Sequence, residues 1–139
     1  ERLTIIQQEP LFIVDGAHNP AAADMLEDSV RKYFKGRKLF FIMGVFRDKD
    51  YPYIIGNSAY AEQIITIETP DNPRALPAQE LAEEEKKCNP HVQAADSIPD
   101  AVDKIFAMAG REDVILSFGS LSFIGEITTI VKTQEEKNS

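Results

Sequence analysis

The chain has very few of the residues on which extracellular and redox-active folds depend. It contains one cysteine, Cys88, and no tryptophan among 139 residues. Because one thiol cannot form an internal disulfide and no signal-like segment opens the sequence, we expect a reducing, cytoplasmic environment. No apolar run approaches the roughly 20 residues of a membrane-spanning helix, so we expect no membrane partner.

Positive charge is also scarce. The chain has 15 lysines and arginines against 23 aspartates and glutamates, which gives a net charge of -8. A nucleic-acid backbone would be repelled, and the sequence has no basic stripe, so we expect no nucleic-acid partner. The length and the 43% hydrophobic content suit one globular domain with its own core, which we expect to be monomeric.

Several common catalytic motifs are missing. The sequence has neither G-x-G-x-x-G nor G-x-x-x-x-G-K-[ST], so it lacks the dinucleotide fingerprint and the phosphate-cradling P-loop. It also lacks the G-x-S-x-G elbow of many serine hydrolases. No H-E-x-x-H or Cys/His spacing occurs, so we expect no metal ligands within this chain. The chain alone therefore cannot grip a triphosphate in the standard way.

Short apolar runs alternate with amphipathic segments along the chain. The runs predict strands over 3–6, 11–14, 39–43, 64–67, 91–94 and 113–118. The segments predict helices over 20–34, 53–61, 77–87, 101–109 and 121–131, before a polar tail that we expect to fray. Within the third helix, Glu83-Glu84-Glu85 is predicted to form a solvated face.

The alternation predicts an α/β fold of Rossmann-like, three-layer type. Parallel crossovers need a dozen or more residues and are normally helical, so helices should cover both faces of a mostly parallel sheet of about six strands. The runs over 3–6 and 11–14 are close enough for a hairpin, which predicts one antiparallel edge strand.

Polar side chains follow the strand over 11–14. Asp15, His18 and Asn19 precede a helix that begins at Pro20. In open α/β sheets ligands bind where strands end and helices begin, and amides at a helix start favour an anion. The alternatives are that Asp15 bonds its own turn, to which we give equal weight, and that His18 is simply solvated.

Two further loops are predicted at the same edge of the sheet. Gly119 and Ser120 follow the last strand and suit a loop that holds a carboxylate or phosphate, although both are ordinary turn residues. The loop over 47–50 carries Lys49, whose neighbours Asp48 and Asp50 offer it local ion pairs.

Four segments, spread in order over the chain, carry a family resemblance. They are Asp15-Gly16-Ala17-His18-Asn19-Pro20, Gly44-Val45-Phe46-Arg47-Asp48-Lys49-Asp50, Pro73-Arg74-Ala75-Leu76-Pro77-Ala78 and Phe118-Gly119-Ser120-Leu121-Ser122-Phe123-Ile124-Gly125-Glu126. Together they resemble the C-terminal domain of folylpolyglutamate synthase, in particular that of the bifunctional bacterial dihydrofolate synthase/folylpolyglutamate synthase. Four ordered landmarks are more specific than one hexapeptide.

The resemblance implies a Mur-ligase-like enzyme. In this family ATP phosphorylates a carboxylate of the folate or its γ-glutamyl tail, and the amine of L-glutamate then displaces phosphate to form an amide. The resemblance further implies that residues 1–139 are the C-terminal glutamate-ligase domain. Its partner would be its own N-terminal ATPase domain, absent from this chain, with the P-loop, the Mg2+ ligands and most of the folate or dihydropteroate site. The isolated domain is then expected to be inactive.

The resemblance also assigns roles to individual residues. Asp15 corresponds to an aspartate that contacts ATP, and Asn19 supports the same nucleotide-binding loop. His18 corresponds to a histidine that faces the phosphate and glutamate region, which makes it the catalytic candidate. Ser120 and Lys49 are the candidates for binding substrate.

Two alternatives stay open. The first is the C-terminal domain of another Mur-type amino-acid ligase, for peptidoglycan precursors or cyanophycin, although those commonly have tyrosine where this chain has Gly16. The second is a non-catalytic flavodoxin-like or receiver module. A receiver would need an acidic pair after its first long strand and a lysine after its last, whereas Asp15 stands alone and Phe118 is followed by Gly119.

Overall fold

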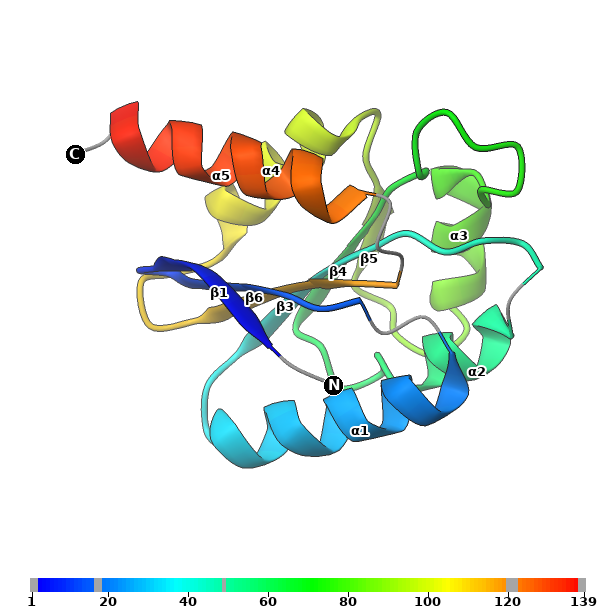
Figure 1. The fold of residues 1–139 in the computed structure, drawn as a ribbon. Coiled ribbons are helices and arrows are strands. Elements are labelled where there is room, and N and C mark those ends of the chain that lie inside the picture. Colours follow the sequence, from blue (N-terminus) through cyan, green and yellow to red (C-terminus); the bar gives the residue numbers. More distant parts are fainter. Residues whose placement is uncertain (1–2, 17–18, 49, 120–122, 138–139) are drawn as a thin grey trace.

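The fold alternates strands and helices along almost the whole chain (Figure 1). A computed structural model describes residues 3–16, 19–48, 50–119 and 123–137. The elements in chain order are β1 (Thr4–Gln8), β2 (Leu11–Val14), α1 (Pro20–Tyr33), β3 (Leu39–Met43), α2 (Tyr51–Gly56), β4 (Gln63–Thr66), α3 (Ala78–Glu85), β5 (Val92–Ala94), α4 (Ile98–Met108), β6 (Val114–Phe118) and α5 (Ile124–Lys137).

Six strands form one sheet in the order β1-β2-β6-β3-β4-β5. Strand β1 pairs antiparallel with β2, with Thr4 opposite Val14, whereas every other neighbouring pair is parallel. This confirms the mostly parallel sheet and its antiparallel edge strand. Strand β6, last in the sequence, lies between β2 and β3, so the carboxyl ends of these three strands are neighbours.

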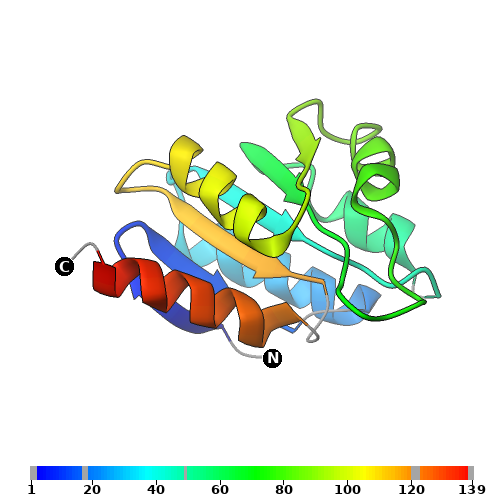
Figure 2. The same ribbon diagram turned by 90° about the horizontal axis from the view of Figure 1, so that it is seen from above.

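Helices cover both faces of the sheet, which makes three layers (Figures 1 and 2). Alternate residues of each strand point to opposite layers. In β3, Phe41 and Met43 pack with α1, α2 and α3, whereas Phe40 and Ile42 pack with α4 and α5. Burial on both faces explains why the strands are continuous apolar runs rather than alternating ones.

Three helices have an end that lies more than two residues from its predicted position. Helix α2 covers 51–56 rather than 53–61. Helix α4 begins at Ile98, three residues early, because the Ser97 hydroxyl accepts a hydrogen bond from the Asp100 amide at 3.1 Å and caps the helix there.

Helix α5 continues to Lys137, into the segment predicted as a frayed tail. The Gln134 side chain donates a hydrogen bond to Asp103 of α4 at 3.1 Å, which ties the polar last turns to a neighbouring helix. The polar residues from Gln134 to Lys137 therefore belong to α5 and lie on a helix at the surface, rather than forming a disordered tail. None of the described helices has the length and apolar character needed to cross a lipid bilayer.

Candidate functional site

The segments that follow β2, β3 and β6 meet at the carboxyl edge of the sheet. Asp15 follows β2, Gly44 follows β3 and Gly119 follows β6, and these strands are neighbours in the sheet. Segments separated by about 100 residues in the sequence therefore lie side by side. This is the edge at which open parallel sheets bind their ligands.

Asp15 is buried at this edge, with 3% of its surface exposed. Its amide donates a hydrogen bond to the Ser117 carbonyl at 3.0 Å, which extends the pairing of β2 with β6 by one residue. The backbone of Asp15 is therefore fixed by the sheet itself. The carboxylate therefore projects from a backbone of fixed position, which suits a ligand-contacting group.

Gly44 and Gly119 bring two of these segments into direct backbone contact. A Cβ atom on Gly119 would lie 2.4 Å from the Gly44 carbonyl oxygen, and Gly119 has a positive φ of 115°. A Cβ on Gly44 would lie 3.0 Å from side-chain carbons of Ile67 and Phe123. Gly119 therefore needs to be glycine, a side chain on Gly44 would require Ile67 and Phe123 to shift, and the two segments approach each other without side chains between them.

Asn19 lies at the start of α1 and caps it. Its side-chain oxygen accepts a hydrogen bond from the Ala22 amide at 2.9 Å, and its carbonyl accepts one from the Ala23 amide at 2.9 Å. The carboxamide oxygen of Asn19 therefore has a structural partner within α1, and the nucleotide-binding role of Asn19 stays a prediction. The residue fixes where the loop ends and the helix begins.

Backbone hydrogen bonds join the loop after β3 to the loop after β4. The Arg47 amide donates to the Arg74 carbonyl at 2.6 Å, and the Leu76 amide donates to the Val45 carbonyl at 3.1 Å. Phe46 and Ala75 form an isolated antiparallel bridge between them. The two loops therefore behave as one short ribbon beside the candidate site.

Side-chain contacts of Arg74 and Arg47 also stabilise this ribbon. Arg74 pairs with Asp48 at 2.8 Å, and its guanidinium lies 4.6 Å from the centre of the Phe46 ring. Arg47 makes two hydrogen bonds to the Glu80 carboxylate, at 3.0 and 3.2 Å. The hydrogen bonds and negative charge of Glu80 raise the pKa of Arg47 above its ordinary value.

Two buried hydroxyl groups lie near the same edge. Thr69, in the loop after β4, and Ser117, in β6 between Val14 and Ile42, are at most 1% exposed. Neither hydroxyl oxygen has a hydrogen-bond partner within the described ranges. The sequence alone gives no signal for Thr69, and the missing G-x-S-x-G elbow argues against Ser117 as a nucleophile.

Three predicted site residues, His18, Lys49 and Ser120, lie outside the residues that the structure describes. Of the predicted set, it therefore places Asp15 and Asn19, four positions apart at the end of β2 and the start of α1. Sequence reasoning assigned no contact to Arg47 and Arg74, although both fall in landmark segments. Arg74 pairs with Asp48, 26 residues away, and Arg47 pairs with Glu80 of α3, 33 residues away. Local sequence spacing does not reveal contacts over such separations.

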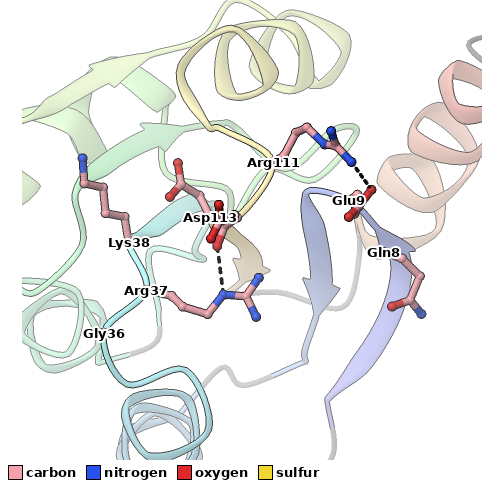
Figure 3. Close-up of a pocket in the computed structure, with 8 residues that line it drawn as sticks. Gln8, Glu9, Gly36, Arg37, Lys38, Arg111 and Asp113 are labelled. Carbon is pink, nitrogen blue, oxygen red and sulfur yellow. Dashed lines mark hydrogen bonds and ion pairs between the residues drawn. The ribbon is translucent and has the colours of Figure 1, made fainter.

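The opposite edge of the sheet carries a separate hollow of about 590 Å³ (Figure 3). Its charged side chains are mixed in sign and largely satisfied within the protein. Arg111 pairs with Glu9 at 3.0 Å, and the Arg37 side chain donates to the Glu112 carbonyl at 2.8 Å (Figure 3). The hollow lies at the amino ends of β3 and β6, away from Asp15, so it is not part of the candidate site.

The described residues offer no metal centre. No group of three or more histidine, cysteine, aspartate or glutamate side chains is placed to hold a metal ion in the part of the chain that the structure covers. The described part of this edge thus provides a fixed carboxylate, close-packed backbone and buried hydroxyls. Such an arrangement suits one wall of a site whose other wall supplies further ligands.

Comparisons with known proteins identify relatives of this chain. Dihydrofolate synthase/folylpolyglutamate synthase of Bacillus subtilis is 28% identical over 132 residues, covering 94% of this chain and 30% of the relative. The protein of the same name from Mycobacterium tuberculosis is 30% identical over 104 residues, covering 73% of this chain and 21% of the relative. The chain thus spans less than a third of the length of these relatives.

Solved structures agree on the fold. Escherichia coli FolC in complex with ADP, without folate substrate, superposes with a TM-score of 0.82 at 24% identity, covering 97% of this chain and 32% of that one. Thermotoga maritima folylpolyglutamate synthase gives 0.76 at 25% identity, covering 96% and 30%. The family model described as Mur ligase, glutamate ligase domain, matches residues 1–121. The chain therefore belongs to the Mur ligase glutamate ligase domain family.

Proposed function

We propose that this chain is the C-terminal domain of an ATP-dependent ligase that adds L-glutamate to folates or to dihydropteroate through an acyl phosphate. The observation that carries the proposal is the meeting of the Asp15, Gly44 and Gly119 segments at one sheet edge. Each belongs to a different landmark of the resemblance. Relatives named as dihydrofolate synthase/folylpolyglutamate synthase align over 94% of the chain, which supports the same substrate class.

The domain is proposed to form one wall of a cleft closed by its own N-terminal ATPase domain. Strand β1 starts opposite Val14, so polypeptide joined ahead of β1 begins at the same sheet edge as Asp15. Ligation through an acyl phosphate depends on positioning and on exclusion of water, and closure of two domains supplies both. The absence of a P-loop motif supports the view that ATP is gripped mainly by the other domain.

Within this cleft, Asp15 is proposed to contact ATP, with Asn19 holding the loop at the start of α1. His18 is proposed to face the reacting phosphate and glutamate, and Ser120 and Lys49 to bind the substrate. Mg2+ ligands are proposed to come from the N-terminal domain, since the described residues contain no acidic or histidine cluster for a metal ion. Structures of relatives bound to ADP, and to AMPPNP with a manganese ion, support nucleotide and metal use in this family.

The proposal is tested with Asp15→Asn in the full-length enzyme. The amide keeps the shape of a side chain that is 3% exposed, so the fold should survive, while the charge is lost. Loss of one hydrogen bond that involves a charged group predicts a fall of about 10- to 100-fold in kcat/KM for ATP. Asp28→Asn, on an exposed position of α1, is the matched control and should leave the kinetics unchanged.

Unchanged steady-state kinetics in Asp15→Asn would remove the nucleotide role and leave Asp15 as a turn residue. The isolated 139-residue chain gives a second test. It should neither hydrolyse ATP appreciably nor form glutamate conjugates, and multiple-turnover ligation by it alone would overturn the proposal. Assays of the full-length enzyme with folate, dihydropteroate and peptidoglycan precursors distinguish folate ligases from other Mur-type ligases.

A further inference from the structure

Helix α3 carries a glutamate that is completely buried. Glu85 has 0% of its surface exposed, whereas Glu83 on the same helix is exposed. The predicted solvated face over 83–85 is therefore wrong at its last position. The buried residues of the helix, Ala78, Leu81, Ala82 and Glu85, follow helical spacing, so Glu85 lies on the core side.

The short contacts around Ser58 bear on whether the Glu85 carboxyl group carries a proton. Ser58 Oγ lies 2.6 Å from the Ile55 carbonyl oxygen and 2.7 Å from Glu85 Oε1. A hydroxyl has one hydrogen, and a carbonyl oxygen can only accept. If Ser58 donates to Ile55, the second short contact is a hydrogen bond only when the Glu85 carboxyl group itself carries the proton and donates it to Ser58.

The other carboxyl oxygen leads to the same conclusion. Glu85 Oε2 is buried and has no hydrogen-bond partner among the residues that the structure describes. An ionised carboxylate at this position would leave an unpartnered charged oxygen in the core, which is strongly unfavourable. A neutral carboxyl group leaves only a weak acceptor there.

Within the described ranges no cationic side chain forms an ion pair with Glu85, and the neighbouring Lys87 pairs with Glu84 instead. Helices and strands packed against α3 are α2, β4 and β5, and their only titratable side chains are Tyr51 and Tyr53. The flanking segments 57–62 and 86–91 carry Tyr60, Glu62, Lys86, Lys87, Cys88 and His91, and α3 itself also carries Glu80, Glu83 and Glu84. Burial raises the pKa of Glu85 to about 8, and only a hydrogen bond that Ser58 would donate to the ionised carboxylate opposes this in part.

We propose that Glu85 is uncharged at neutral pH and acts as a proton-dependent joint, in which Glu85 donates to Ser58 and Ser58 donates to the Ile55 carbonyl. The joint connects α3 to the end of α2. The loop after β3 leads into α2 and the loop after β4 leads into α3, so the ribbon adjoins the starts of these two helices, whereas the joint lies at their far ends, next to the segment that leads into β4. Ionisation at alkaline pH breaks the joint and loosens α2 from α3.

The direction of the pH effect follows from proton uptake. In the folded chain the pKa is raised, from the ordinary value of 4.5 to about 8, so between these values the folded state keeps a proton that the unfolded state has lost. Stability therefore falls as pH rises through this window. The equilibrium constant for unfolding should increase by roughly tenfold per pH unit from this group and level off above the folded pKa.

Urea unfolding of the chain between pH 6 and pH 9 tests this expectation. Glu85→Gln keeps a neutral donor of the same shape and should be more stable than the wild type at pH 9, and its unfolding constant should lack the component that rises by up to about 100-fold over this range. Glu83→Gln makes the same charge change on the exposed face of α3 and should retain the wild-type slope. Equal pH slopes in the wild type and Glu85→Gln would overturn the proposal.

Carboxyl ¹³C NMR of the folded wild-type chain gives a test that no variant can complicate. The Glu85 resonance should titrate near pH 8, and titration near pH 4.5 would overturn the proposal. Hydrogen exchange locates the effect, since amides of 51–58 should exchange faster in the wild type than in Glu85→Gln at pH 9 and equally at pH 6.5. Equal exchange at both pH values would show that ionisation does not open the joint.

Discussion

Asp15, Asn19 and Glu85 are polar residues with very different surroundings. The sequence predicts the place of Asp15 well, because four apolar residues immediately before it define a buried strand and therefore its end. It also marks Asn19 as the boundary of a helix, although it does not show that the side-chain oxygen caps Ala22. The run of three glutamates predicts a solvated face that includes Glu85, whereas the helical spacing of the apolar residues places Glu85 on the core side. The spacing from Leu81 and Ala82 was the available signal.

Alanine substitutions at three glycines separate the cost of a positive φ from the cost of a steric collision of the added Cβ atom. Gly119→Ala combines a positive φ with a collision against the Gly44 carbonyl and should destabilise the chain by about 2 kcal/mol or more. Gly36→Ala has a positive φ of 83° but open space, so it should cost about 1 kcal/mol. Urea unfolding at constant pH measures both.

Gly56→Ala is the control for this series, because its Cβ would meet nothing within 4 Å and its backbone is helical. It should be neutral or slightly stabilising, since alanine favours helices. If Gly119→Ala cost no more than Gly36→Ala, the close contact between the segments after β3 and β6 would not exist in solution.

Helix and strand types were predicted better than their ends. All six strands and five helices occur where the apolar periodicity places them, because the central strands β2, β3, β4 and β6 are buried on both faces and each helix is buried on one. Helix ends depend instead on single hydrogen bonds, such as the Ser97 cap of α4 and the contact between Gln134 and Asp103 at the end of α5. Such contacts join specific atoms, and hydrophobic patterning carries no information about them.

The start of α1 offers a prediction at the scale of an element. Asn19→Asp keeps an oxygen that can accept from the Ala22 amide, whereas Asn19→Ala removes it. The alanine variant should lose about 1 kcal/mol of stability, and the aspartate variant should stay close to the wild type. Thermal unfolding of the 139-residue chain measures the difference.

The same pair separates capping from nucleotide binding in the full-length enzyme. If Asn19 acts only by capping α1, Asn19→Asp should retain wild-type kcat/KM for ATP. A stable Asn19→Asp variant with impaired ATP use would show that the uncharged carboxamide has a role beyond capping.

At the scale of the whole molecule, every central strand contributes to both hydrophobic layers. Phe41 of β3 packs in one layer and Phe40 in the other, so neither layer can be lost while the sheet remains. The sequence predicts this architecture, but it does not predict the strand order. Insertion of β6 between β2 and β3 depends on contacts about 100 residues apart, and it is this insertion that brings Gly119 to Gly44.

This interdependence predicts two-state unfolding. All four tyrosines lie on α1, on α2 or just after α2, so tyrosine fluorescence reports on one layer, whereas far-UV circular dichroism reports on the whole chain. The two urea curves should coincide.

Core substitutions in either layer extend the test. Leu26→Ala in α1 and Ile105→Ala in α4 should each shift both curves together by about 2–5 kcal/mol. Curves that separate in either variant would mean that the layers unfold independently.

The antiparallel direction of β1 also determines how the chain can be handled in the laboratory. Strand β1 starts at the edge that carries Asp15, whereas α5 runs from that edge toward the opposite one (Figure 1). An affinity tag or fluorescent protein fused ahead of residue 1 is therefore delivered to the candidate site and competes with whatever docks there. Fusions and surface attachment after residue 139 leave that edge accessible, which makes the carboxyl end the better point for immobilising the domain in binding experiments.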